Sequence, residues 1–159
     1  MEGDADTRLR VCMVDHNVFS VRLADRLKNT YPQINQPEWA RFVKTCPARI
    51  EVPKNPEWWY VRAASIMRKL ALNGGMTIRD FEVAYGGKRS SGRRPEKFVP
   101  AAGGHLRRIL KQLESAGLVE SQKGSGRTLT AQGVALIRKV ADELVAEQLK
   151  RNPALTIYV

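Results

Sequence analysis

The stretch from residue 105 to residue 145 constrains the fold of this chain more than any other part of the sequence. Its first half places four large apolar residues at the spacing i, i+3, i+4 and i+7, which is one face of an α-helix: Leu106, Ile109, Leu110 and Leu113. Gly117 ends this helix, and strand-like segments at 118–120 and 127–129 then flank a basic, glycine-rich turn. Thr130 caps a last helix with its own apolar stripe, formed by Val134, Ile137, Ala141, Leu144 and Val145.

Four helices are predicted before this stretch, at about residues 15–29, 38–44, 55–73 and 77–85. In the second of them, Trp39 and Val43 are spaced for burial on one face. The order helix, helix, recognition-like helix, β-hairpin, helix predicts a mainly α fold: a winged helix-turn-helix core with a small β-hairpin wing and additional N-terminal helices. The 159 residues fit one domain at 15–150, with an N-terminal extension at 1–14 and a C-terminal tail at 151–159.

The third predicted helix opens with three consecutive aromatic residues, Trp58, Trp59 and Tyr60. Three neighbours in sequence cannot share one helix face, so at least one points away from the main core. Two interpretations remain open. The favoured one is an aromatic cluster that clamps the proline-rich connector at 46–56, and the other is a platform on which nucleic-acid bases stack.

Charge is concentrated in one quarter of the chain. The sequence has 27 Lys and Arg against 16 Asp and Glu, a net charge of +11, and this makes a polyanion the expected partner. Residues 88–127 carry +7 of that charge, because three glutamates oppose ten basic residues: Lys88, Arg89, Arg93, Arg94, Lys97, Arg107, Arg108, Lys111, Lys123 and Arg127. Residues 88–100 are predicted to form a basic loop that becomes ordered against RNA. A plain solvated basic surface is the alternative.

Several functional classes lack support in the sequence. No apolar run approaches the ~20 residues of a membrane span, and the acidic N-terminus has no signal-peptide pattern. Cys12 and Cys46 have no metal-ligand spacing and are interpreted as reduced thiols. His16 and His105 have no paired carboxylate or cysteine and are interpreted as polar-face or capping residues. Residues 86–90 lack phosphate-loop spacing. We therefore expect no enzyme activity, no metal and no cofactor.

Three stretches of the sequence resemble the nineteen-e family of small-subunit ribosomal proteins. The first is Trp58-Trp59-Tyr60-Val61-Arg62-Ala63-Ala64-Ser65, which continues to Gly74-Gly75. The second is Tyr85-Gly86-Gly87, followed by Gly92, Pro95 and Phe98. The third covers 110–119 and then Gly126-Arg127, Leu129-Thr130 and Gln132-Gly133. The resemblance extends over about residues 15–147. The sequence departs from the family in a longer acidic N-terminus, in the apolar end at 155–159, and in the stretch 135–138, where an acidic residue is expected.

The resemblance implies a structural constituent of the small-subunit head that binds ribosomal RNA and is needed for subunit maturation. Its implied partners are that RNA, neighbouring head proteins and assembly factors, with the chain monomeric in the ribosome and away from membranes. The implied location is cytoplasmic, with a nucleolar or nuclear assembly stage if the cell is eukaryotic. On matching positions, the leading RNA-binding residues are Arg62, Arg68, Arg107 and Arg108, and Lys69 is a further candidate.

Binding is expected to rely on shape and phosphate contacts, because side chains cannot read the deep, narrow major groove of RNA. If about 6–8 phosphates are neutralised, affinity falls by orders of magnitude over a modest rise in salt. The main alternative is a winged-helix transcription regulator of the multiple-antibiotic-resistance type, which binds duplex DNA as a dimer. A module that contacts only proteins is a third possibility, but it leaves the clustered cations unexplained.

Overall fold

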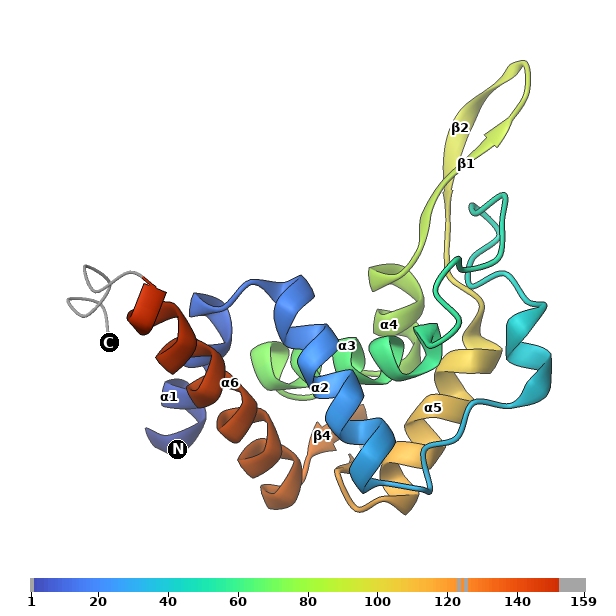
Figure 1. Ribbon diagram of the computed structural model, residues 1–159. Coiled ribbons are helices and arrows are strands. Elements are labelled where there is room, and N and C mark those ends of the chain that lie inside the picture. Colours follow the sequence, from blue (N-terminus) through green and yellow to red (C-terminus); the bar gives the residue numbers. More distant parts are fainter. Residues whose placement is uncertain (1, 123, 125, 152–159) are drawn as a thin grey trace.

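The computed structural model describes residues 2–122, 124 and 126–151 and shows a helical body from which one β-hairpin projects (Figure 1). Two separate two-stranded antiparallel sheets accompany the helices. This confirms the predicted mainly α fold. In chain order the elements are α1 (Glu2–Met13), α2 (His16–Thr30), the 3-10 helix η1 (Glu38–Arg41), α3 (Trp58–Asn73), α4 (Ile78–Ala84), β1 (Gly87–Ser91), β2 (Arg94–Val99), α5 (Gly103–Ser115), β3 (Val119–Gln122), β4 (Gly126–Leu129) and α6 (Ala131–Arg151).

Helix α3 is the centre of the core, and α1, α2, α5, α6 and strand β4 pack around it. Its small residues Ala63 and Ala64 are fully buried and allow neighbouring helices to approach closely. Large side chains fill the remaining directions, namely Trp58, Trp59, Ile66, Met67 and Leu70. A helix that is apolar on most sides has to be enclosed by others, and this explains the central place of α3.

Helices α3, α4 and α5, followed by the β3–β4 hairpin and α6, have the order of a winged helix-turn-helix. Thr77 begins α4 with a capping box, in which its side chain and that of Asp80 bond reciprocally to the backbone. The wing is tied to the segment before α4, because Met76 and Arg127 exchange two backbone hydrogen bonds of 3.0 and 2.8 Å. Gly126, at φ +83°, makes this close approach possible.

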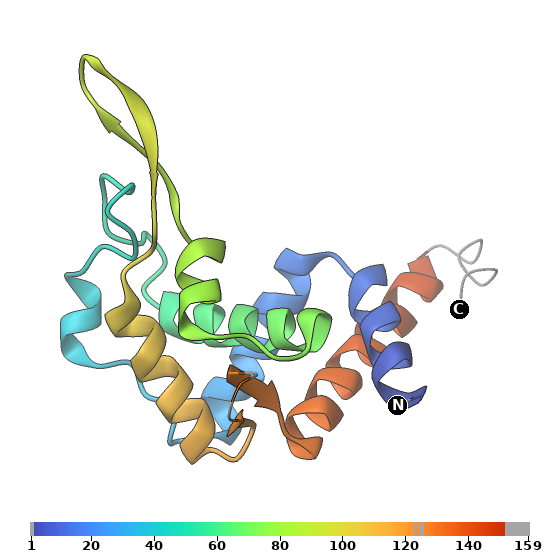
Figure 2. The ribbon, with the colours of Figure 1, turned by 180° about the vertical axis from the view of Figure 1, so that it is seen from behind.

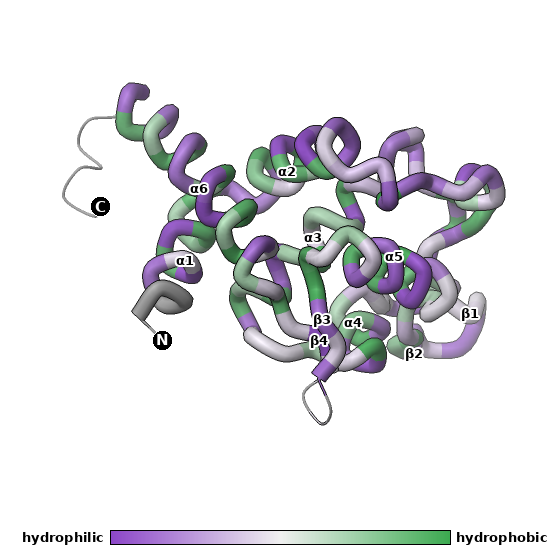
Figure 3. The backbone as a smooth tube through the Cα atoms, turned by 90° about the horizontal axis from the view of Figure 1, so that it is seen from below, coloured by the Kyte–Doolittle hydropathy of each residue, from purple (hydrophilic) through white to green (hydrophobic). Residues whose placement is uncertain are grey.

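The pattern that most constrained the prediction is confirmed in α5 and α6. Leu106, Ile109, Leu110 and Leu113 are all fully buried, and each contributes about 1.5–3 kcal/mol relative to exposure. Gly117 ends the helix at φ +71°. The Thr130 hydroxyl donates to the Gly117 carbonyl at 2.6 Å and accepts from the Gly133 N–H. The alternation of hydrophilic and hydrophobic residues along α2 and α5 is visible in Figure 3.

The predicted basic loop at 88–100 is wrong, because these residues form the antiparallel β1–β2 hairpin. Gly92 and Arg93 connect the strands. Of these two turn residues, only Gly92 has a positive φ (+72°). This is the pattern of a type II′ turn, whose twist suits antiparallel strands. Pro95 is tolerated in β2 because each strand of a two-stranded sheet has one unpaired edge. The hairpin occupies the connection between α4 and α5 and projects away from the helices (Figures 1 and 2).

Other elements differ from prediction in extent. The predicted helix at 38–44 is only the four-residue η1, in which Ala40 is buried while Trp39 stays 43% exposed. Helix α3 begins at Trp58, after the Asn55 side chain has accepted a hydrogen bond from the Glu57 N–H. Helix α2 matches its prediction, and Asp15 caps it.

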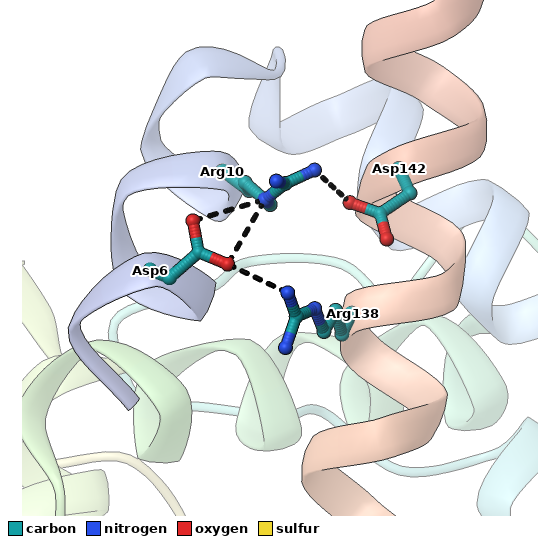
Figure 4. A network of polar contacts seen from close by, with 4 residues as sticks. All are labelled: Asp6, Arg10, Arg138 and Asp142. Carbon is teal, nitrogen blue, oxygen red and sulfur yellow. Dashed lines mark hydrogen bonds and ion pairs between the residues drawn. The ribbon is translucent and has the colours of Figure 1, made fainter. Parts of the chain in front are cut away.

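Residues 1–14 were set apart as an extension, and within them α1 packs against α6 through a four-residue ionic network (Figure 4). Arg138 donates to Asp6 at 2.8 Å. Arg10 forms two ion pairs, one with Asp6 at 3.1 Å and one with Asp142 at 2.6 Å. Val11 on α1 and Val14 after it are buried beneath. The N-terminal segment thus belongs to the packed body. The predicted C-terminal tail lies outside the described residues except for Arg151.

Candidate nucleic-acid interface

Five of the predicted RNA-binding residues lie on the β1–β2 hairpin, and all five are exposed: Lys88, Arg89, Arg93, Arg94 and Lys97. Among the described residues, none of them has an ion pair or a side-chain hydrogen bond. Arg89 and Lys97 are direct cross-strand partners, which places two like charges side by side on one face. Such a pair destabilises a hairpin in isolation. The hairpin therefore holds uncompensated positive charge that an external anion would neutralise.

Helix α5 presents a second set of cations beside the hairpin base. Arg107, Arg108 and Lys111 are exposed, as the opposite face of the apolar stripe predicts. Arg107 lies 3.5 Å from Glu82, a long contact for a side chain that is 58% exposed. An exposed pair of this kind contributes ~0–1 kcal/mol and is easily exchanged for a phosphate. Arg108 and Lys111 make no ion pair with any described residue.

Arg62 is held in a defined position by an aromatic ring. Its guanidinium carbon lies 3.9 Å from the Tyr85 ring centroid, a cation–π geometry, and the Tyr85 hydroxyl is 2.8 Å from Ser65 Oγ. Burial lowers the pKa of Arg62 and raises the pKa of Tyr85. The guanidinium borders a hollow of about 640 Å³ that Arg49 also lines. A partly desolvated, oriented arginine suits bidentate phosphate binding.

The other two candidates on α3 are less accessible. Arg68 is half-buried, and its Nε atom is shielded from solvent without a hydrogen bond to any described residue. Lys69 is also half-buried, with its Nζ atom 5.3 Å from the Tyr85 ring centroid. Tyr85 thus gathers Arg62 and Lys69 on one side of α3.

In the wing, the structure describes one of the two predicted RNA-binding cations. Arg127 forms a 3.0 Å ion pair with Glu114 and is only 22% exposed, so its guanidinium already has an anionic partner. Lys123 lies outside the described residues. Among the described residues of the predicted set, the exposed cations without a close ion pair therefore lie on the hairpin and α5.

At the opposite end of the molecule, four arginines are paired internally, while Lys139, Lys150 and Arg151 of α6 are exposed and form no ion pair with a described residue. Arg22 bonds Glu147 at 3.1 Å and Arg26 bonds Glu143 at 2.5 Å, both between α2 and α6. The α1–α6 network of Figure 4 adds Arg10 and Arg138. Figures 1 and 2 place α1 and α6 on the far side of the body from α5 and the hairpin. Much of the positive charge of α1 and α2 is therefore neutralised within the molecule, whereas that of the hairpin is not.

Trp58 and Trp59 form a buried structural cluster, as the favoured interpretation expects, but their side-chain hydrogen bonds reach η1 and α5 and not the connector at 46–56. The Trp58 indole donates to the Ala40 carbonyl at 3.2 Å, and that of Trp59 donates to Gln112 at 2.8 Å. Both rings are buried, with centroids 5.4 Å apart in an edge-to-face arrangement. They fasten η1 and α5 to α3, so neither ring is open for base stacking.

The interpretation of His105 as a polar-face or capping residue is wrong. It is 3% exposed, and its ring lies edge-on to Trp58 at 5.7 Å. Burial, assisted by the positive charge of Arg62, lowers the pKa of His105 to about 4. The chain therefore holds a neutral histidine in its core at physiological pH.

Sequence reasoning missed Lys44, Arg49 and Tyr85. Arg49 belongs to the irregular connector and Lys44 lies just before it, in a region whose position depends on tertiary contacts such as the 3.1 Å hydrogen bond from the Ala102 N–H to the Thr45 carbonyl. Tyr85 is the last residue of the helix predicted at 77–85 and is interpreted there only as its end. Its spacing of four from Phe81 was an available signal, and the two rings stack at 6.4 Å.

The described residues carry no other recognisable site. Within 2–122, 124 and 126–151, no group of three or more His, Cys, Asp or Glu side chains is placed to hold a metal ion. Cys12 is exposed and Cys46 is buried, and both are free thiols. No helix in the part of the chain that the structure describes is long and apolar enough to cross a membrane.

The fold and this surface define a winged helix-turn-helix protein with a basic end. The family model described as ribosomal protein S19e matches residues 10–147. The small ribosomal subunit protein eS19 of Aeropyrum pernix is 44% identical over 139 residues, which are 87% of this chain and 91% of the relative. The eS19B protein of Drosophila melanogaster is 33% identical over 146 residues (92% and 94%), and eS19 of Mya arenaria is 38% identical over 140 (88% and 93%).

The chain therefore belongs to the ribosomal protein S19e family, and the resemblance seen in the sequence is confirmed. It is a structural protein of the small ribosomal subunit, a kind of protein that serves translation rather than catalysis. The alternative of a transcription regulator finds no support in these relatives.

Proposed function

We propose that this chain binds small-subunit ribosomal RNA through its basic end, formed by the β1–β2 hairpin, the exposed face of α5 and Arg62. The unpaired cations of the hairpin are the observation that carries this proposal. Arg89 and Lys97 repel each other in the free protein, and a phosphate between them converts that repulsion into two favourable contacts. Because the strands already pair in the free protein, binding does not have to meet the full cost of folding this segment.

The position of the hairpin favours folded RNA over a DNA major groove. A recognition helix reads DNA with its N-terminal residues. In this chain the β1–β2 hairpin directly precedes the N-terminus of α5, the end that would have to enter the groove. It is anchored there by the hydrogen bond from the Ala101 N–H to the Glu82 carbonyl, 2.8 Å. A long arm beside a basic helix contacts phosphates on separate parts of a folded surface. The structure of the RNA then supplies specificity.

The resemblance to the family supports the finer parts of the proposal. They are a place in the head of the small subunit, contacts with neighbouring head proteins and assembly factors, and a requirement during maturation, with a nucleolar stage in a eukaryotic cell. The unpaired cations of the hairpin support one element of this arrangement. RNA approaches the hairpin end, and the α1–α6 end, where four arginines are paired internally, remains for protein neighbours.

The test compares two triple variants that lose the same charge. One is Arg89→Gln, Arg94→Gln and Lys97→Gln on the hairpin, and its control is Lys139→Gln, Lys150→Gln and Arg151→Gln on α6, where all three are exposed. Binding to purified small-subunit RNA is measured over a range of KCl concentrations. Each lost phosphate contact lowers the log–log salt slope by about 0.7–0.9, so the hairpin variant should lose about 2–3 and the control none.

Equal slopes for both variants would refute the assignment of the hairpin. Preference of the wild type for duplex DNA over the ribosomal RNA at the same salt would restore the regulator alternative. In cells, tagged hairpin variant should fail to sediment with small subunits after a high-salt wash, while small-subunit precursors accumulate. Normal subunit maturation with that variant would remove the proposed role in assembly.

A further inference from the structure

Two aromatic side chains stand exposed beside the base of the basic hairpin. Phe42 is 81% exposed and Trp39 is 43% exposed. They flank a rigid turn, because η1 is fixed by buried Ala40, whose carbonyl accepts the Trp58 indole hydrogen bond. The Trp39 ring also packs edge-on against Trp59, with centroids 5.7 Å apart at 85°. The body thus presents Trp39 from a preorganised position.

The two aromatics border adjoining hollows on the surface. Trp39 lines one of about 430 Å³, and Phe42 lines the other of about 530 Å³. Both hollows share Val43, Lys44 and Ala102, so they form one continuous depression that we call the aromatic–basic hollow. Each half is large enough to receive a small planar ring system.

The charge around the hollow indicates the chemistry of its occupant. Arg108 of α5 lines the half with Trp39, Arg89 of β1 lines the half with Phe42, and Lys44 lines both. None of the described residues that line either half is acidic. Arg89 belongs to the hairpin as well, so the hollow continues the surface that we assigned to RNA phosphates.

Exposed aromatic faces next to cations have a specific use in RNA recognition. Unpaired bases stack on aromatic rings while nearby arginines and lysines hold the phosphates. An apolar protein segment would also cover Trp39 and Phe42, but it would leave three cations without partners. A nucleotide satisfies both components at once, since it combines a planar apolar face with a negative charge.

We propose that the aromatic–basic hollow binds an unpaired nucleotide of the RNA, with its base stacked on Trp39 or Phe42 and its phosphate held by Lys44, Arg89 or Arg108. This inference rests on the proposed function and deepens it. It assigns two binding modes to one surface. The hairpin contacts the backbone of folded RNA, and the hollow holds a base that has left its stack.

Tryptophan fluorescence of the full chain can test this directly. Trp58 is 7% exposed and Trp59 is buried, so Trp39 is the one tryptophan that an external base can reach. Hexa-adenylate RNA should quench part of the emission at low salt, and Trp39→Leu should abolish that quenching. An RNA duplex of equal length should not quench. Quenching of the Trp39→Leu variant equal to that of the wild type would overturn the inference.

Affinity supplies the second measurement. Leucine keeps apolar bulk but has no aromatic face, so Trp39→Leu with Phe42→Leu should weaken binding to small-subunit RNA about 5- to 150-fold for one lost stack. Val21→Ala, which alters a valine that is 52% exposed on α2, is the control and should bind as the wild type does. Circular dichroism melting verifies that each variant is folded.

The outcomes separate this inference from the proposed function. If the leucine variant binds RNA as the wild type does while the hairpin variant loses binding, the nucleotide site is refuted and the hairpin interface stands. If the leucine variant binds RNA normally but fails to join the small subunit, the surface contacts a protein and the inference is again refuted. If neither the wild type nor any variant binds the RNA, the proposed function itself fails.

Discussion

A single charge reversal on the hairpin should change stability and RNA binding in opposite directions. Lys97 faces Arg89 across the β1–β2 pair, and directly opposed residues have Cβ atoms about 4.5–5.5 Å apart. Two unit charges about 6 Å apart in water repel by roughly 0.7 kcal/mol before salt screening. Lys97→Glu replaces this repulsion with attraction. After screening at physiological salt, we expect the hairpin to gain about 0.5 kcal/mol.

The gain is local, so the assay has to report on the hairpin itself. Hydrogen exchange of the backbone amides of β1 and β2 should slow about twofold in Lys97→Glu, while the melting temperature of the body stays unchanged. The same substitution removes one phosphate contact and adds a repulsive charge. Binding to small-subunit RNA should therefore weaken about tenfold or more, with a salt slope smaller by about 0.7–0.9.

Two comparisons make this reasoning refutable. Lys139→Glu on α6 makes the same change in net charge at the opposite end and should alter neither hairpin exchange nor RNA affinity. Faster exchange in the Lys97→Glu hairpin would show that the opposed cations are not a source of repulsion. Unchanged RNA affinity together with slower exchange would show that the hairpin lies outside the interface.

Three further predictions concern the body. The pKa of His105 is about 4 in the folded protein and 6.5 in the unfolded chain, so its contribution to the free energy of unfolding is full above pH 6.5 and falls by at most about 3 kcal/mol as the pH drops to 4. In urea titrations at several pH values, the free energy of unfolding of His105→Gln should therefore depend less steeply on pH over this range. Gly126→Ala would place Cβ 2.4 Å from the Met76 carbonyl oxygen and should lower the free energy of unfolding by at least about 3 kcal/mol. The control Gly74→Ala also has a positive φ but open space around its Cβ, and should cost about 1 kcal/mol. Equal losses for the two variants in denaturant melts would contradict this reasoning. In a double-mutant cycle, Asp6→Asn and Arg138→Gln should couple by about 0.5 kcal/mol, and 1 M salt should remove the coupling.

The parts of the fold that sequence predicted are those whose stability comes from burial. The stripe from Leu106 to Leu113 and the caps at Asp15 and Thr130 are local patterns that the structure reproduces. The β1–β2 hairpin carries no such pattern. All residues from 88 to 98 are exposed, so strand pairing there depends on backbone hydrogen bonds and on the Gly92 turn. A method that looks for apolar periodicity interprets such a segment as a loop.

The candidate site shows a similar division. Counting charges located the basic region between residues 88 and 127, but a count cannot tell a paired cation from a free one. Arg127 and Lys97 look alike in the sequence. The fold brings Glu114 to within 3.0 Å of Arg127, whereas it brings only Arg89 opposite Lys97. Availability to an external anion is thus a property of tertiary structure.

Two segments interpreted from the sequence as departures from the family, the acidic N-terminus and residues 135–138, meet in space. The first supplies Asp6 and the second supplies Arg138, and the two side chains bond at 2.8 Å (Figure 4). An acid at position 138 would face Asp6 and repel it. Their pairing also neutralises an arginine far from the hairpin. The acidic N-terminal segment therefore neutralises a cation of α6 and leaves those of the hairpin without a partner among the described residues.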